Sequence, residues 1–117
     1  MEFEIIRDYF STLGTVRDDV ILGVGDDAAL LQMPIGEQLV VTSDTSIAGV
    51  HFPVETAPYD IGWKALAVNL SDLAAMGATP RWFTLALTLP AMDADWLQGF
   101  AQGLHACATR YGVALIG

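Results

Sequence analysis

Three groups of oxygen-bearing side chains stand in otherwise apolar stretches of this sequence. The first is the acidic pair in Gly-Val-Gly-Asp-Asp-Ala-Ala at residues 23–29, the second is Thr-Ser-Asp at residues 42–44, and the third is Asp72. Carboxylate and hydroxyl oxygens are ligands that Mg²⁺ and Ca²⁺ prefer, whereas zinc favours nitrogen and sulfur. The three groups together therefore predict a site for hard divalent cations, which would let an acidic protein bind phosphates.

Each group alone also has an ordinary structural explanation. Gly-Asp and Thr-Ser-Asp-Thr are typical turn sequences, and Asp72 could be a surface acid or a carboxylate bonded to a backbone amide. The argument for a site rests on their joint occurrence, because neighbouring carboxylates repel one another unless cations neutralise them.

The elements that must position these groups follow from hydrophobic periodicity and from glycine and proline breaks. Helices are predicted at residues 2–13, 59–76 and 93–111, with Asp93 as the N-cap of the last. Strands are predicted at residues 20–24, 28–32, 39–44, 82–89 and 113–116. This order predicts an α/β (α+β) sandwich in which helices pack on one face of a mixed sheet.

Two of these elements carry the candidate ligands. Alternation along the strand 39–44 places Thr42 and Asp44 on one face and Ser43 on the other. The helix 59–76 has apolar residues on two nearly opposite sides, and Asp72 falls in the middle of one of them. We therefore expect this helix to be packed on both sides and Asp72 to be shielded from solvent.

Composition excludes several classes of protein. The length of 117 residues is typical of a single domain. The net charge is −9, and a protein this acidic is not expected to have the basic surface that nucleic-acid binding requires. No apolar run reaches the ~18 residues of a membrane span, and the amino terminus does not resemble a signal peptide. A single cysteine, Cys107, excludes an intramolecular disulfide and favours a reducing compartment, so a cytoplasmic location is expected.

The remaining reactive side chains give weaker signals. His51 lies on a predicted loop between Gly49 and Pro53, where a histidine is more often exposed than functional. His105 is expected to be structural, because it lies beside the apolar stripe of its helix. Cys107 has no basic neighbour in the sequence that would make it a nucleophile. The three tryptophans are expected to be packing groups.

Three motifs resemble the amino-terminal domain of the thiamine-monophosphate kinase family. They are Gly-Val-Gly-Asp-Asp-Ala-Ala, Thr-Ser-Asp-Thr-Ser-Ile-Ala-Gly-Val-His-Phe, and Lys-Ala-Leu-Ala-Val-Asn-Leu-Ser-Asp-Leu-Ala-Ala-Met-Gly-Ala-Thr-Pro. The resemblance covers nearly the whole chain. Its last motif is shared in looser form by the wider superfamily of aminoimidazole ribonucleotide synthetase-like ATP-binding proteins, which implies a largely antiparallel sheet.

The resemblance implies ATP-dependent phosphorylation of thiamine monophosphate to thiamine diphosphate by direct in-line transfer. Several Mg²⁺ ions would hold the phosphates, and His51 would contact thiamine monophosphate. The implied metal ligands are Asp27, Thr42, Ser43, Asp44 and Asp72. No covalent phosphoenzyme is implied, so positioning and charge neutralisation would supply most of the catalysis.

The family pattern continues beyond Leu-Ile-Gly with a Gly-Asp-Thr segment and a second domain. We therefore expect residues 1–117 to form one amino-terminal domain that pairs as a homodimer but lacks kinase activity alone. Two alternatives stay open. One is another ATP-dependent enzyme of the superfamily, such as a selenophosphate synthetase, although the expected cysteine or selenocysteine beside a lysine does not precede Gly23. The other is a non-catalytic acidic dimerisation module.

Overall fold

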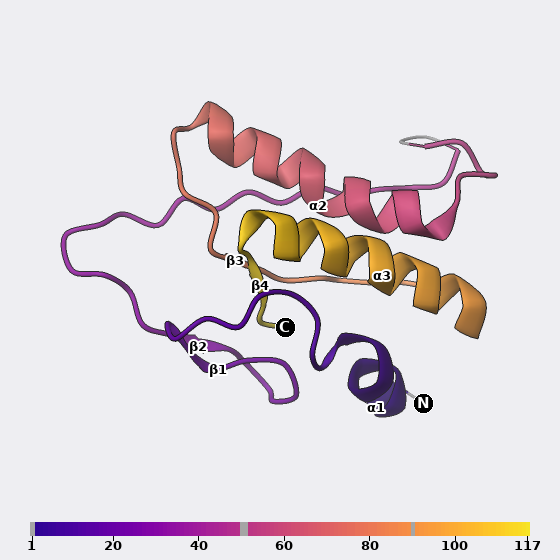
Figure 1. Ribbon diagram of the computed structural model, residues 1–117, viewed down its shortest axis with the longest axis horizontal. Helices are drawn as coiled ribbons and strands as arrows, with labels where there is room; N and C mark the ends of the chain where they lie inside the picture. Colours follow the sequence, from indigo (N-terminus) through magenta and orange to yellow (C-terminus); the bar gives the residue numbers. More distant parts are fainter. Residues whose placement is uncertain (1, 50–51, 90) are drawn as a thin grey trace.

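The protein is described here by a computed structural model that covers residues 2–49, 52–89 and 91–117. Two long helices, α2 (Pro58–Ala75) and α3 (Ala94–Tyr111), lie side by side and run in the same direction (Figure 1). The other elements of the described residues are four short strands and an amino-terminal helical segment. The helical segment consists of α1 (Glu2–Ile5) followed by a π-helical turn, η1 (Ile6–Phe10).

The limits of both long helices agree with the sequence predictions to within one residue. Pro58 begins α2 at a position that needs no backbone N–H donor, and Gly77 follows its end with φ +69°. The Asp93 carboxylate caps α3 by accepting the Trp96 N–H, and Gly112 ends that helix in the left-handed conformation. The amino-terminal helix ends earlier than the predicted residue 13, at Phe10.

Three glycines and one proline bring α2 and α3 into close contact. A Cβ added to Gly103 would lie 1.9 Å from the carbonyl oxygen of Tyr59, and one added to Gly62 would lie 2.1 Å from that of Phe100. Gly99 faces the ring of Pro58 less tightly. The backbones therefore meet at a distance that only glycine permits at two of these positions.

The core is built mainly around α3. Its inward stripe is almost completely buried and packs against α2, the amino-terminal helical segment and β4 (Ala114–Leu115). The side chains of Leu97, Leu104 and Cys107 are at most 1% exposed. Trp96 stacks on Phe100 with ring centroids 5.0 Å apart, which confirms the packing role expected of this tryptophan.

The α+β class is confirmed, but the strands are shorter than predicted and form two separate pairs. β1 (Val20–Leu22) pairs antiparallel with β2 (Leu30–Leu31), and β3 (Trp82–Phe83) pairs parallel with β4. After Phe83 the chain follows the predicted alternation: Leu85, Leu87 and Leu89 are partly buried against the core, whereas Thr84, Ala86 and Thr88 are exposed. Hydrogen bonding of this segment to its neighbour ends at Leu85, whose N–H donates to the Gly117 carbonyl.

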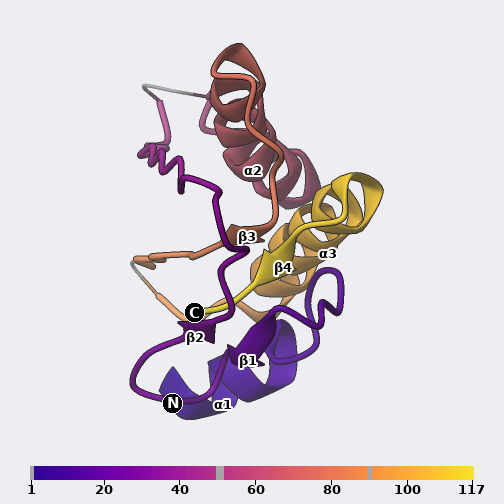
Figure 2. The ribbon, with the colours of Figure 1, turned by 90° about the vertical axis from the view of Figure 1, so that its left-hand side faces the viewer.

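The predicted strand at residues 39–44 is wrong for this structure. The structure describes every residue from 38 to 47, and none of them belongs to a strand. Figure 2 shows that this segment runs past β3 and then lies apart from α2. An extended chain becomes a strand only when a neighbour pairs with its amides and carbonyls, and the segment 38–47 has no such ladder within the described residues.

Candidate functional site

A cleft of about 1330 Å³ lies between the extended segment 38–48, helix α2 and the segment that follows β3. Its walls are largely apolar, with contributions from Val40, Leu66, Leu70 and Phe83. Its polar lining residues include the Thr-Ser-Asp motif and Asn69 of α2. A mainly apolar hollow with a few convergent polar groups is the usual form of a small-molecule site.

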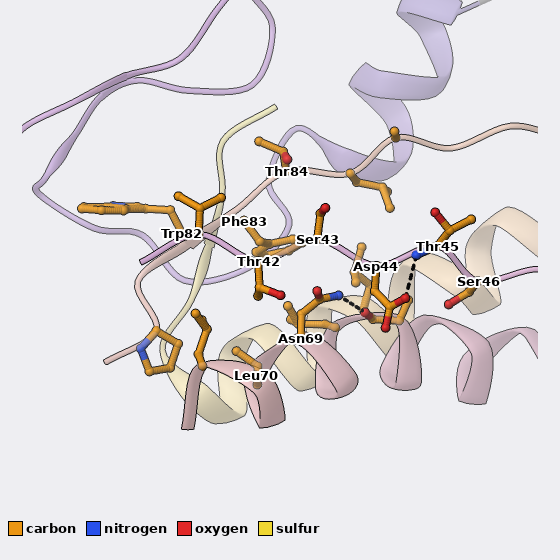
Figure 3. A pocket seen from close by; sticks show the side chains of 18 of the residues that line it. Thr42, Ser43, Asp44, Thr45, Ser46, Asn69, Leu70, Trp82, Phe83 and Thr84 are labelled. Atoms are coloured by element: carbon orange, nitrogen blue, oxygen red, sulfur yellow. Dashed lines mark hydrogen bonds between the residues drawn. The ribbon is translucent and has the colours of Figure 1, made fainter. Parts of the chain in front are cut away.

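The Thr-Ser-Asp motif lines one wall of this cleft, as Figure 3 shows. Thr42 and Asp44 point towards α2, and Ser43 points to the other side. The alternation predicted for these three residues is therefore present although no strand is formed, because an extended backbone alone directs successive side chains to opposite sides. Thr42 is partly buried, and Ser43 and Asp44 are exposed.

Local hydrogen bonds shape the two acidic turns. The Asp44 carboxylate accepts the Thr45 N–H at 2.9 Å, and the Asp26 carboxylate accepts the Asp27 N–H at 2.8 Å. In each case one carboxylate oxygen is occupied by the backbone of the next residue. Both Asp26 and Asp27 are exposed, so exposure does not separate them as candidate ligands.

The other predicted ligands do not reach the cleft. Asp27 lies in the loop between β1 and β2, Asp72 lies on α2, and neither lines the cleft wall. Within residues 2–49, 52–89 and 91–117, no three histidine, cysteine or acidic side chains come close enough together to hold a metal ion. Only Thr42, Ser43 and Asp44 are therefore brought to one place, and the five-residue ligand set stays a prediction. His51 lies outside the described residues.

The expectation that Asp72 is shielded is wrong for the chain as described. Asp72 is exposed, and Met76 on the same side of α2 is 71% exposed. Only Ile61, Gly62 and Leu66 of this helix are fully buried. The side of α2 that carries Asp72 is buried at Ile61 near the start of the helix but exposed at Asp72 and Met76 near its end, and helical periodicity cannot say how far along its length an apolar side is covered.

One charged cluster near the strands was missed by sequence reasoning. Arg17 binds both carboxylate oxygens of Asp19, at 3.0 and 2.8 Å, and the indole N–H of Trp82 donates to the same carboxylate at 2.9 Å. The Arg17 guanidinium, followed by the indole N–H, lowers the pKa of Asp19. Asp19 thus ties the beginning of β1 to β3 across 63 residues, and Trp82 has a polar role in addition to packing.

His105 and Cys107, the two reactive side chains of α3, have environments that fit structural roles. The backbone N–H of Gly14 donates to Nδ1 of His105 at 2.9 Å, which supports the structural role expected of that histidine. Burial raises the pKa of the Cys107 thiol, so its thiolate form is disfavoured, in agreement with the expectation that it is not a nucleophile. Among the described helices, none is both long and apolar enough to cross a membrane.

The sequence matches the model of the family described as AIR synthase related protein, N-terminal domain, over residues 25–117. The chain belongs to this family. The matched region contains the cleft, both long helices and all five candidate metal ligands, which confirms the superfamily resemblance drawn from the motifs.

Within this family, the chain is similar to several proteins named thiamine-monophosphate kinase. The chain is 51% identical over 116 residues to the thiamine-monophosphate kinases of Salmonella typhimurium and Escherichia coli, covering 99% of this chain and 36% of each relative. The Bacillus subtilis protein of the same name is 39% identical over 119 residues. A crystal structure of thiamine-monophosphate kinase from Stenotrophomonas maltophilia superposes with a TM-score of 0.80 at 64% identity, over 86% of this chain and 32% of that one. This chain therefore spans about a third of the length of the relatives that it matches.

Proposed function

We propose that this chain supplies the metal- and phosphate-binding part of an ATP-dependent kinase that converts thiamine monophosphate to thiamine diphosphate. The observation that carries the proposal is the position of the Thr42–Asp44 motif on the wall of the large cleft, in a chain that is 51% identical over 116 residues to proteins named for this activity. The strongly acidic composition is consistent with phosphate binding through divalent cations rather than through lysine and arginine.

Oxygen donors suit both Mg²⁺ and Ca²⁺, and Mg²⁺ is the ion proposed here because it is usually bound by one or two carboxylates together with the phosphates of a nucleotide. The candidate ligands Asp27, Thr42, Ser43, Asp44 and Asp72 offer oxygen atoms only, and two of them, Thr42 and Asp44, point towards the same side of the cleft. When bound, such ions would neutralise the charge of the phosphates and hold them for reaction. Asp27 and Asp72 lie outside the cleft wall, so their contribution requires the bound phosphates or a further part of the protein to bring them into range.

The reaction needs no protein nucleophile. A terminal phosphate oxygen of thiamine monophosphate is already anionic near neutral pH, and it would attack the γ-phosphorus of ATP directly. The bond from that phosphorus to the bridging oxygen breaks, and ADP leaves with the electron pair. The residues of this chain would orient the two substrates and exclude water, and His51 would contact thiamine monophosphate. This agrees with the buried, disfavoured thiolate of Cys107.

Metal binding gives the most direct test of this function. We expect Mg²⁺, titrated by calorimetry in the presence of a non-hydrolysable ATP analogue, to bind the wild type at least tenfold more tightly than Asp44→Asn, since about 1.4 kcal/mol corresponds to a tenfold change in affinity. Asparagine keeps an oxygen that can accept the Thr45 N–H, so the turn is preserved. Asp95→Asn removes one equally exposed carboxylate from the start of α3 and is the matched control. Equal affinities in all three proteins would refute the metal site.

Turnover is a separate question. Because the chain spans 36% of its relatives' length, we propose that the 117 residues alone form no thiamine diphosphate. Formation of thiamine diphosphate from ATP and thiamine monophosphate by the purified chain, measured by chromatography, would contradict this. The sequence of the gene beyond codon 117 tests the same point, and a Gly-Asp-Thr segment followed by a second domain is expected there.

We also propose that the chain pairs as a homodimer. Apolar side chains on α2 and on the extended segment are exposed, among them Met76 at 71% and Val41 at 77%. Contiguous exposed apolar surface commonly marks an interface. Sedimentation equilibrium is expected to give twice the mass of the chain, and a purely monomeric species at micromolar concentration would rule out this dimer.

A further inference from the structure

Asn69 of α2 has an unusual environment on the wall of the cleft. Its side-chain nitrogen donates a hydrogen bond to the carbonyl oxygen of Ala65 at 3.0 Å, one turn earlier in the helix. Its side-chain oxygen, Oδ1, is buried and has no hydrogen-bond partner among the described residues. A buried acceptor without a donor costs free energy, so a carboxamide at this position requires an explanation.

The orientation of the Asn69 carboxamide is fixed by Ala65. Turning the group over would place Oδ1 against the Ala65 carbonyl oxygen, and two acceptors would then face each other. The nitrogen therefore stays on α2, and Oδ1 stays on the other side. The unsatisfied atom is the one that remains available for a donor from another element.

The extended segment offers a hydroxyl donor beside Asn69 on the matching side. Thr42 and Asp44 both point towards α2 and lie near Asn69 in Figure 3, whereas Ser43 points away. An ionised Asp44 carboxylate accepts hydrogen bonds but has none to donate. The Thr42 hydroxyl can donate, and within the Thr42–Asp44 motif it is the side chain on this side whose chemistry matches Oδ1.

We propose that Asn69 is a positioning residue: its Oδ1 accepts a hydrogen bond from the Thr42 hydroxyl and thereby orients Thr42 in the metal-bound protein. A hydroxyl that donates its one hydrogen to Asn69 keeps its lone pairs for a cation. Asn69 would thus act on the metal site through Thr42, without contacting the ion. This inference deepens the function proposed above and rests on it.

A double-mutant cycle tests the coupling. Asn69→Leu removes the acceptor at similar volume, Thr42→Val removes the donor, and Gln102→Ala removes an exposed carboxamide from α3 as the control. The measured quantity is the affinity for Mg²⁺ in the presence of a non-hydrolysable ATP analogue. We expect Asn69→Leu to lower this affinity about fivefold to tenfold in the wild type and less than twofold in the Thr42→Val background. Gln102→Ala is expected to leave it unchanged.

The outcomes separate the inference from the function on which it rests. If Asn69→Leu weakens Mg²⁺ binding by the same factor in both backgrounds, or in neither, Asn69 does not act through Thr42 and the inference is overturned while the metal site stands. Failure of the wild type to bind Mg²⁺ with the ATP analogue would overturn the function and the inference together. Asn69→Ala gives the same comparison if Asn69→Leu does not fold, as judged by circular dichroism.

Discussion

The α2–α3 pair and the extended segment 38–48 line the same cleft but are held in place by different forces. The helices contain their own backbone hydrogen bonds and meet at Gly62 and Gly103, with no room for a Cβ atom between them. Residues 38–47 of the segment have no strand partner among the described residues, Ala48 makes an isolated bridge with Phe52, and Val41 is 77% exposed. Contacts along α3 therefore determine the fold, whereas the candidate ligands Thr42, Ser43 and Asp44 lie on the less constrained wall.

This difference is physically reasonable for the phosphate-binding site proposed above. Carboxylates and hydroxyls packed into the core would need internal partners, and Asp44 instead stays exposed. The helix pair is rigid because its backbones meet at glycine residues. Asn69 is a polar side chain of this pair that lines the same cleft as the Thr42–Asp44 motif. The predictions below test this contrast between a rigid helix pair and a loosely held segment.

The largest effect is expected from Gly103→Ala. Its Cβ would lie 1.9 Å from the Tyr59 carbonyl oxygen, so the two helix backbones must separate. We expect the free energy of unfolding, measured with urea, to fall by about 3 kcal/mol, at the upper end for overpacked sites, despite alanine's better helix propensity. Gly99→Ala is the control in the same helix, where the nearest atom is a proline side chain at 3.1 Å, and it should change stability by less than about 1 kcal/mol. Similar values for the two variants would contradict the close contact.

Asp19→Asn is expected to cost about 2 kcal/mol, because it removes charge-assisted hydrogen bonds with Arg17 and leaves that guanidinium without its carboxylate. The neighbouring, exposed Asp18→Asn should cost much less.

The Asp19 contact also predicts a pH dependence. Its pKa is lowered in the folded protein, so its contribution to stability is complete above the ordinary pKa of 3.8 and is lost as the pH falls through the lower folded value. The wild type should therefore lose more stability than Asp19→Asn between about pH 4 and pH 2 in urea titrations. Parallel acid profiles would show that this ion pair does not form in solution.

His105→Ala is expected to lower the free energy of unfolding by about 1 kcal/mol, because the Gly14 N–H loses its acceptor. His105→Asn keeps an acceptor near the position of Nδ1 and should recover most of this loss. Chemical denaturation at pH 8 measures both. An equal loss in the two variants would mean that the hydrogen bond to Gly14 is not the cause.

The smallest effect is expected in the extended segment. Val41→Ala should change stability by less than about 0.5 kcal/mol, because the side chain is 77% exposed. Val113→Ala makes the same chemical change at a position that is 1% exposed and should cost about 2 kcal/mol. A large cost for Val41→Ala would show that the segment is covered in solution, as the proposed dimer would allow.

Features that depend on neighbours along the chain were predictable. The limits of α2 and α3 follow from Pro58, Gly77, Asp93 and Gly112, whose effects on the backbone are local. The one-sided burial of residues 83–89 follows from alternation, and so does the separation of Ser43 from Thr42 and Asp44. The motif at residues 42–44 was recognised as a candidate because its residue types determine its chemistry wherever it lies.

Features that depend on distant partners were not predictable. Strand formation at residues 39–44 requires a paired ladder, and the sequence cannot say whether one is present. The hydrogen bond from Trp82 to Asp19 joins residues that are 63 positions apart, and no local sequence pattern predicts it. Asn69 was passed over because an asparagine inside a helical motif gives no signal until the structure shows its buried oxygen.

The sequence by itself thus determined the limits of the two long helices, the alternation and the residue types of the candidate ligand motif, since backbone propensities and side-chain types act over a few residues. Only the tertiary structure decided that Thr42 and Asp44 face α2 across a cleft, that Asp72 is exposed, and that Asp27 lies apart from both. Those arrangements depend on which distant surfaces meet, and that is determined by packing of the whole chain rather than by any one segment.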